Sequence, residues 1–91
     1  MAERYFNGYF PEVGDVVKVV SAETYEDRMS VGSMLHVLHV ESESEGPGLI
    51  EVPWKNSKTG WNCPWRFALI KRADGTLPVK TEEQKMRVIK D

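Results

Sequence analysis

Few residues of this 91-residue chain have the types and spacing that catalysis requires. The single cysteine, Cys63, precedes Pro64, and no neighbour in the sequence is suited to activate its thiol. His36 and His39 are three residues apart, which on a strand places them on opposite faces and prevents them from sharing a metal ion. There is no phosphate-binding glycine loop and no signature of paired carboxylates. The sequence therefore predicts a binding protein rather than an enzyme, with no cofactor, metal ion or small-molecule substrate.

Tryptophans and basic residues alternate in the second half of the chain, a pattern that could bind nucleic acid. Aromatic rings can stack on nucleobases while lysine and arginine hold the phosphates. Trp54 and Trp65 are expected to fill the core of a small domain, whereas Trp61 is expected to be exposed. The candidate nucleic-acid site consists of Lys55, Lys58, Trp61 and Arg66.

Acidic residues are concentrated earlier in the chain, where they could bind a basic surface of a protein partner. Residues 21–53 carry seven acids and one base, whereas residues 54–91 carry nine bases and four acids. Such an uneven distribution can orient a partner, and it is equally compatible with ordinary solvated loops. The candidate protein-binding residues lie in two loops and are Glu23, Tyr25, Glu26, Asp27, Glu41, Glu43 and Glu45.

Short hydrophobic segments separated by turn signals must position these side chains. Runs of β-branched residues and alternating apolar residues indicate strands rather than helices. Pro53 favours an edge position or a bulge for the strand that contains it. The expected strands are 13–20, 33–43, 50–54, 61–63 and 68–71, with a tight turn over 65–67 before the last. The predicted fold class is therefore all-β, with five strands.

Segments at both ends are expected to supplement a small core. Four aromatic residues lie between positions 5 and 10, and at least two should be buried, with Tyr5 or Tyr9 the more exposed because their hydroxyls tolerate water. Thr81 to Gln84 has the form of a capping box and predicts a short C-terminal helix, which needs Met86 and Ile89 to pack on the barrel or on a partner. The expected organisation is an aromatic arm over 1–12, a barrel over 13–72, and a linker with a helix over 73–91.

The overall composition is that of an ordinary soluble protein, with 41% hydrophobic residues, 29% charged residues and a net charge of -2. This balance provides neither the positive field of a non-specific nucleic-acid coat nor the carboxylate excess of an acidic DNA mimic. No apolar run approaches the roughly 20 residues of a membrane span, and the first residues lack the apolar core of a signal peptide. We expect a cytoplasmic protein that does not contact membranes.

The order of these elements resembles the SH3-like barrel over Phe10–Arg72. The residues that carry the resemblance are Val13-Gly14-Asp15, Val31-Gly32, Glu51-Val52-Pro53-Trp54, and Trp61 followed by Phe67-Ala68-Leu69-Ile70. Similar patterns occur in KOW-type and bacterial SH3-like modules and in small phage-encoded proteins. The resemblance implies a five-stranded SH3-like barrel and leaves the function to the individual surface.

Three functions are compatible with these features. The leading hypothesis is a small protein-binding regulator or inhibitor, and the resemblance suggests a phage-encoded one that acts on a host protein. One alternative is nucleic-acid binding, which would weaken steeply as salt increases. The other is a structural subunit of a larger phage assembly, which would associate with itself.

Overall fold

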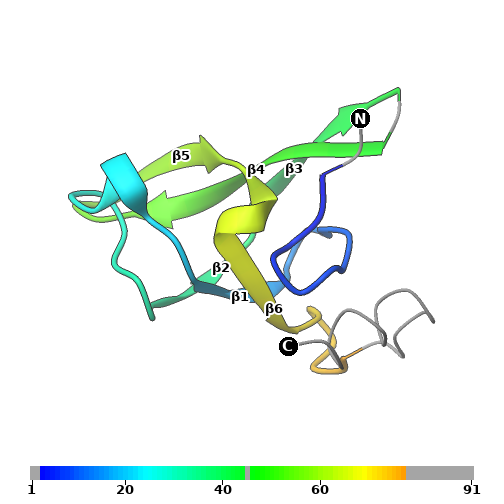
Figure 1. Ribbon diagram of the computed structural model, residues 1–91. Coiled ribbons are helices and arrows are strands. Elements are labelled where there is room, and N and C mark those ends of the chain that lie inside the picture. Colours follow the sequence, from blue (N-terminus) through cyan, green and yellow to red (C-terminus); the bar gives the residue numbers. More distant parts are fainter. Residues whose placement is uncertain (1–2, 45, 78–91) are drawn as a thin grey trace.

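The computed structural model describes residues 3–44 and 46–77, which form an all-β protein with two three-stranded antiparallel sheets (Figure 1). The first sheet has the order β2-β1-β6, and its strands are β1 (Val16–Val19), β2 (Met34–His36) and β6 (Phe67–Lys71). The second has the order β3-β4-β5, and its strands are β3 (His39–Glu43), β4 (Gly46–Trp54) and β5 (Lys58–Asn62). Two short 3-10 helices are η1 (Glu23–Tyr25) and η2 (Pro64–Arg66). The helix expected at the C-terminus lies outside the described residues.

The long strand expected over 33–43 is divided into β2 and β3, so the described chain has six strands rather than five. Val37 donates its N–H to the carbonyl of Asp15 in the first sheet, at 2.9 Å. Leu38 donates its N–H to the carbonyl of Glu51 in the second sheet, at 2.8 Å. The chain therefore crosses from one sheet to the other between these two adjacent residues.

The crossing also changes which side chains face the core. Leu35 and Val37 pack inward before it, and Val40 packs inward after it, so a single alternation over the whole segment is wrong. His36 and His39 are both exposed. They lie on different sheets because the crossing separates them.

Pro53 lies in the central strand of the second sheet, not at an edge as its lack of an N–H suggests. Alternate residues of a strand direct their main-chain groups to the same neighbour, so Pro53 faces the same side as Glu51, which accepts a hydrogen bond from Leu38. A main-chain N–H at position 53 would need a carbonyl on that side, and the carbonyl of Val37, the residue opposite, already accepts the N–H of Gly14 at 2.8 Å. The proline therefore removes no hydrogen bond from the sheet.

Two aromatic residues of the N-terminal arm complete the core, as expected, but they are the two tyrosines rather than the two phenylalanines. Tyr5 and Tyr9 are only 1% and 3% exposed, whereas Phe6 and Phe10 are exposed. The hydroxyl of Tyr5 donates a hydrogen bond to Asp15 Oδ2 at 2.7 Å, so its polar group is satisfied inside the protein. The buried hydrophobic residues are Tyr5, Tyr9, Val17, Val19, Ala22, Met29, Val37, Ile50, Val52, Phe67 and Leu69.

The carboxylate of Asp15 is fully buried and joins three segments of the chain. Its Oδ2 accepts hydrogen bonds from the Tyr5 hydroxyl, the Glu12 N–H at 2.8 Å and Arg72 Nη1 at 2.9 Å. Arg72 Nη1 also donates to the Phe10 carbonyl at 2.9 Å. A buried carboxylate is tolerated only when it is paired and hydrogen-bonded. Oδ2 makes all of the carboxylate's contacts, whereas Oδ1 is buried without a hydrogen-bond partner among the described residues.

We predict that Tyr5→Phe lowers the free energy of unfolding by about 1.5–3 kcal/mol, because the substitution removes a hydrogen bond to a buried charged group. Urea denaturation measures this change. Tyr25→Phe is the matched control, since the Tyr25 hydroxyl has no hydrogen bond among the described residues, and it should stay within about 0.5 kcal/mol of the native protein. Equal losses in the two variants would contradict the assigned role of Tyr5.

The stability contributed by Tyr5 should also disappear at alkaline pH. Burial, together with the hydrogen bond to Asp15, raises the pKa of Tyr5 above its ordinary value. The folded protein therefore retains a proton that the unfolded chain releases above about pH 10, so stability falls as pH rises beyond that point. The difference in unfolding free energy between the native protein and Tyr5→Phe should shrink by up to about 1.4 kcal/mol per pH unit there. A constant difference from pH 8 to pH 11 would refute this.

Candidate functional site

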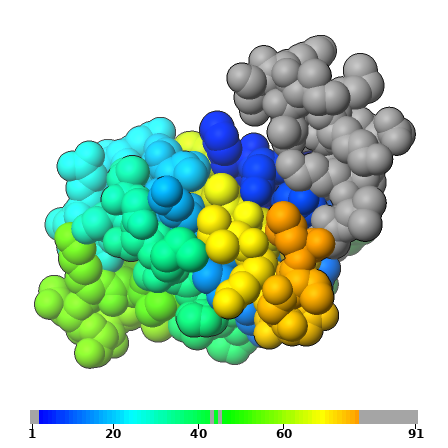
Figure 2. All heavy atoms as spheres, turned by 90° about the horizontal axis from the view of Figure 1, so that it is seen from below, coloured from blue at the N-terminus to red at the C-terminus, as the bar shows by residue number. Residues whose placement is uncertain are grey.

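The first loop, residues 20–33, lies beside the tip of the β4–β5 hairpin at one end of the molecule (Figure 2). The Lys55 N–H donates to the Arg28 carbonyl at 2.8 Å, and Lys55 Nζ donates to the Glu26 carbonyl at 3.4 Å. These bonds join two segments that are far apart in the sequence. The end of the molecule that they form is the candidate site.

The first loop is held in shape by its own buried residues and main-chain bonds. Ala22 and Met29 are buried at either side of its exposed part. Between them, the N–H groups of Arg28 and Met29 donate to the Tyr25 carbonyl at 2.8 and 2.9 Å. The loop therefore turns back on itself, with Tyr25 packed against the core and Arg28 exposed.

Five side chains from the first loop, β4 and η2 form a stack that we name the aromatic–arginine cluster: Tyr25, Arg28, Trp54, Trp65 and Arg66. The guanidinium carbon of Arg28 lies 5.1 Å from the Trp54 ring centroid and 5.5 Å from that of Tyr25. The guanidinium carbon of Arg66 lies 5.2 Å from the Tyr25 centroid and 4.6 Å from the Trp65 centroid. Tyr25 and Trp54 contact each other with centroids 5.9 Å apart. Each arginine thus contacts two rings at cation–π distance.

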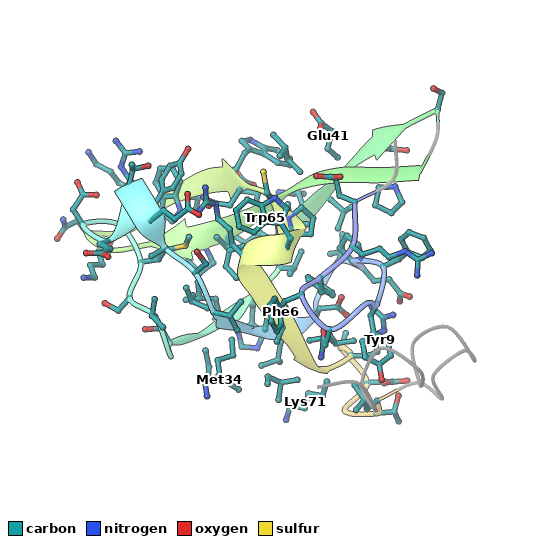
Figure 3. All side chains as sticks on the ribbon, in the orientation of Figure 1. Phe6, Tyr9, Met34, Glu41, Trp65 and Lys71 are labelled. Atoms are coloured by element: carbon teal, nitrogen blue, oxygen red, sulfur yellow. The ribbon has the colours of Figure 1, made fainter. Side chains whose placement is uncertain are left out.

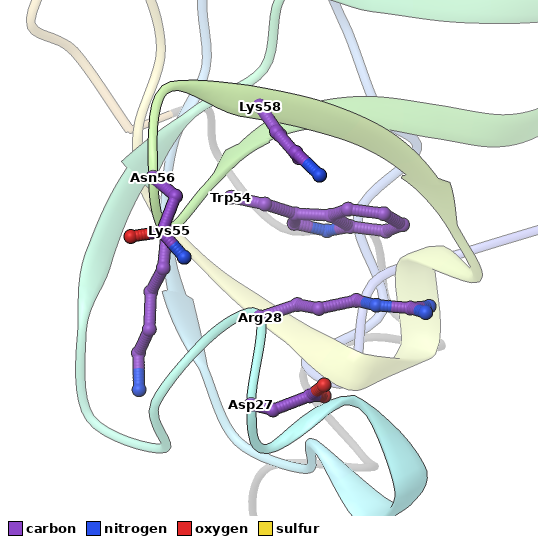
Figure 4. A pocket seen from close by; sticks show the side chains of 6 residues that line it. All are labelled: Asp27, Arg28, Trp54, Lys55, Asn56 and Lys58. Carbon is purple, nitrogen blue, oxygen red and sulfur yellow. The ribbon is translucent and has the colours of Figure 1, made fainter.

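The Trp54 ring is fixed on several sides. Its Nε1 donates to Asn62 Oδ1 at 2.9 Å, and its six-membered ring lies so close to Gly60 that an added Cβ would collide with it. Arg28 and Lys58 lie on opposite sides of the ring (Figure 4). Neither face of this indole is open to a second flat ligand.

A pocket of about 370 Å³ opens between the first loop and the hairpin (Figure 4). Its lining residues are Asp27, Arg28, Trp54, Lys55, Asn56 and Lys58. Three cations therefore line it against one carboxylate. Within the described part of the chain, none of the three cations forms an ion pair.

Backbone strain is concentrated around this site. Glu23, Asn56 and Ser57 have φ angles of 46°, 64° and 61°, and they are the non-glycine residues with positive φ in residues 3–44 and 46–77. Glu23 belongs to η1 in the first loop, and the other two form the tip of the hairpin. A left-handed conformation costs a residue with a Cβ roughly 1–2 kcal/mol, and such strain is often found at functional sites.

The acidic residues predicted to bind a partner are not brought together. Glu23, Glu26 and Asp27 lie in the first loop, where Glu23 pairs with Arg66 Nη2 at 3.4 Å. Glu41 lies on β3, near the other end of the second sheet, and lines a separate pocket of about 330 Å³ (Figure 3). Glu43 is the last residue of β3, and Glu45 lies outside the described residues. Along β4, Glu43 pairs with Gly46, roughly 26 Å from Trp54, and Glu41 accepts the N–H of Leu49, roughly 17 Å from Trp54.

The predicted nucleic-acid residues are also divided. Lys55 and Lys58 line the pocket, but Trp61, exposed as expected, lies on the other face of β5 because it is an odd number of residues from Lys58. The cross-strand neighbour of Trp61 is Glu51, whose pKa is held below its ordinary value mainly by a hydrogen bond from His39. Arg66 is buried in the cluster rather than exposed for phosphate.

Three members of the cluster were not predicted as site residues from the sequence. Trp54 was expected in the core, and it packs against the core while also forming part of the cluster. Trp65 was expected in the core, but it is 41% exposed, since η2 buries Pro64 and Arg66 on either side of it. Arg28 was not proposed as a site residue. Its signal in the sequence is that it is the sole base within residues 21–53.

Among the described residues, no group of three or more histidine, cysteine, aspartate or glutamate side chains could hold a metal ion. None of the helices in the same residues is long and apolar enough to cross a membrane. Comparison with models of known families, with curated protein sequences and with solved structures finds no match to this chain. The site is therefore interpreted from its own geometry.

Gly60→Ala should disrupt the site from within, because the new Cβ must displace the Trp54 ring. We expect a loss of about 1–3 kcal/mol in unfolding free energy, the usual cost of overpacking. Thr59→Ser, at the exposed neighbouring position, keeps the hydroxyl that donates to Glu51 Oε2 and is the control, which should change stability by less than about 0.5 kcal/mol. Thermal and urea unfolding measure both, and a neutral Gly60→Ala would show that the ring is not held over this glycine.

Proposed function

We propose that the chain is a non-enzymatic, SH3-like binding module that recognises a protein partner through the aromatic–arginine cluster. As a regulator or inhibitor, it would act by covering a surface of that partner. The proposal keeps the first-loop residues Glu23, Tyr25, Glu26 and Asp27 at the interface. It does not include Glu41 and Glu43, which lie on β3, or Glu45.

The arrangement of strands supports the SH3-like part of the proposal. One chain segment crosses between the sheets at Val37 and Leu38, so β2 and β3 act as the two halves of a bent strand. A 3-10 turn, η2, precedes the last strand, β6, which pairs with β1. A long first loop, a β4–β5 hairpin and such a turn are the elements that the sequence resemblance implies.

The observation that carries the functional proposal is the composition and exposure of the cluster. Tryptophan, tyrosine and arginine are the residue types most enriched among those that dominate binding energy at protein interfaces. All five members of the cluster are of these types, and Arg28 and Trp65 are exposed. Because their rings and guanidinium groups already contact each other, binding a partner would immobilise few additional side chains.

Charged residues surround this apolar centre. Glu26 and Asp27 are exposed in the first loop, and Lys55 and Lys58 are exposed on the hairpin. Charges at the rim of an interface mainly accelerate encounter and select partners, whereas the buried centre supplies most of the affinity. The cluster, rather than the acidic residues alone, is therefore the part of the proposal to test first.

Trp65→Ala should reduce recovery of a protein partner in affinity capture at least tenfold, because an interface tryptophan often contributes 2 kcal/mol or more. The measurement uses the tagged protein and lysate of its native or host cell, with and without nuclease, followed by quantitative mass spectrometry. Trp61→Ala is a matched control, since the two tryptophans are 41% and 44% exposed, and Trp61 lies on the outer face of β5.

Three outcomes would contradict the proposal. Equal loss of a partner in both tryptophan variants would place the interface elsewhere. Recovery that disappears with nuclease would favour nucleic acid. Recovery of the tagged chain alone, with concentration-dependent self-association, would favour a structural subunit.

A further inference from the structure

We infer that the pocket between the first loop and the β4–β5 hairpin binds an acidic segment of the partner, through aspartate or glutamate side chains or a terminal carboxylate. This inference rests on the proposed function and names the chemistry of the partner. The acidic sequence of the first loop suggests a basic partner, whereas this pocket calls for an acidic one.

The charge of the pocket supports this assignment. Arg28, Lys55 and Lys58 come from two segments and converge on one cavity with only Asp27 opposing them. The cations form no ion pair with the described residues, so they are available to an external anion. Arg28 presents a planar group that can bind a carboxylate with two hydrogen bonds, and the lysines add point charges.

The hairpin holds its lysines in place before any ligand arrives. Asn56 and Ser57 adopt left-handed conformations, and the turn they form lies between Lys55 and Lys58. The hydrogen bond from the Lys55 N–H to the Arg28 carbonyl, at 2.8 Å, joins the hairpin to the first loop at the pocket and fixes these two lining residues relative to each other. The left-handed turn thus sets the spacing between Lys55 and Lys58. This spacing is a functional reason for retaining the backbone strain.

A carboxylate fits this pocket better than a nucleobase. Stacking requires an open aromatic face, but the Trp54 ring has Arg28 on one side and Lys58 on the other, and it lies directly against Gly60. Trp61, the tryptophan with the more exposed ring, lies on the far side of β5 from these cations. The pocket therefore provides charge without a stacking platform.

The direct test measures binding of fluorescein-labelled hexaglutamate by fluorescence polarisation, with hexathymidylate as the nucleic-acid probe. The double variant Lys55→Glu/Lys58→Glu should lose about tenfold or more in affinity for hexaglutamate, since two attractive charges become repulsive. Lys18→Glu/Lys71→Glu is the control, because it changes the net charge equally at exposed positions of the first sheet, and it should stay within about twofold. Circular dichroism verifies that both variants fold, and Lys58→Gln serves if the double variant does not.

Each other outcome would overturn the inference. Absence of hexaglutamate binding, or equal loss in the control variant, would show that the pocket does not recognise acidic segments. Tighter binding of hexathymidylate that depends on the same lysines would identify a nucleic-acid site. Self-association that the pocket variant abolishes would identify a second copy of the chain as the occupant. Partner capture that still depends on Trp65 would leave the proposed function standing in any of these cases, since Trp65 does not line the pocket.

Discussion

One buried carboxylate, that of Asp15, holds the separate parts of this small protein together. Its donors come from the N-terminal arm (Tyr5), from the chain just before β1 (Glu12) and from the residue after β6 (Arg72). The main-chain carbonyl of Asp15 accepts the N–H of Val37, where the chain crosses between the sheets. If any of these donors were removed, the buried carboxylate or the buried carbonyl would lose a hydrogen bond that offsets its burial. The N-terminal arm, the first sheet, the crossing to the second sheet and the residue after β6 therefore depend on one another.

The same frame determines where the candidate site forms. The carbonyl of Arg66 accepts the N–H groups of Val20 and Ser21 at 2.8 and 3.2 Å, which ties the start of the first loop to η2. The side chain of Arg66 then stacks on Tyr25, within the same loop. Main chain and side chain of one residue thus connect the fold to the aromatic–arginine cluster. The cluster is a continuation of the core rather than a set of mobile surface groups.

The sequence predicted features that depend on neighbours along the chain and missed those that depend on neighbours in space. The all-β class followed from alternation and turn residues, and the exposure of Trp61 followed from its place in a short strand. The burial of Tyr5 could not be foreseen, because the acceptor of its hydroxyl is ten residues away and becomes adjacent only in the fold. Trp65 was misplaced because η2 buries Arg66, whose guanidinium group lies against the Tyr25 and Trp65 rings, and the sequence does not show that an arginine takes that position.

The charge of the pocket also depends on neighbours in space, and the sequence therefore did not predict it. Residues 21–53 are strongly acidic as a segment, yet the pocket beside them is cationic, since Arg28 is joined there by two lysines from the other half of the chain. Glu23 is paired with Arg66, and only Asp27 of the first-loop acids lines the pocket. Glu41 Oε1 accepts the N–H of Leu49, which lies five residues before Trp54 on β4 and therefore roughly 17 Å from it along the strand, beyond the 8–10 Å over which physiological salt screens exposed charges. The distant acids therefore cannot neutralise the pocket, and its preference for an anion is decided by three side chains that are neighbours only in the folded protein.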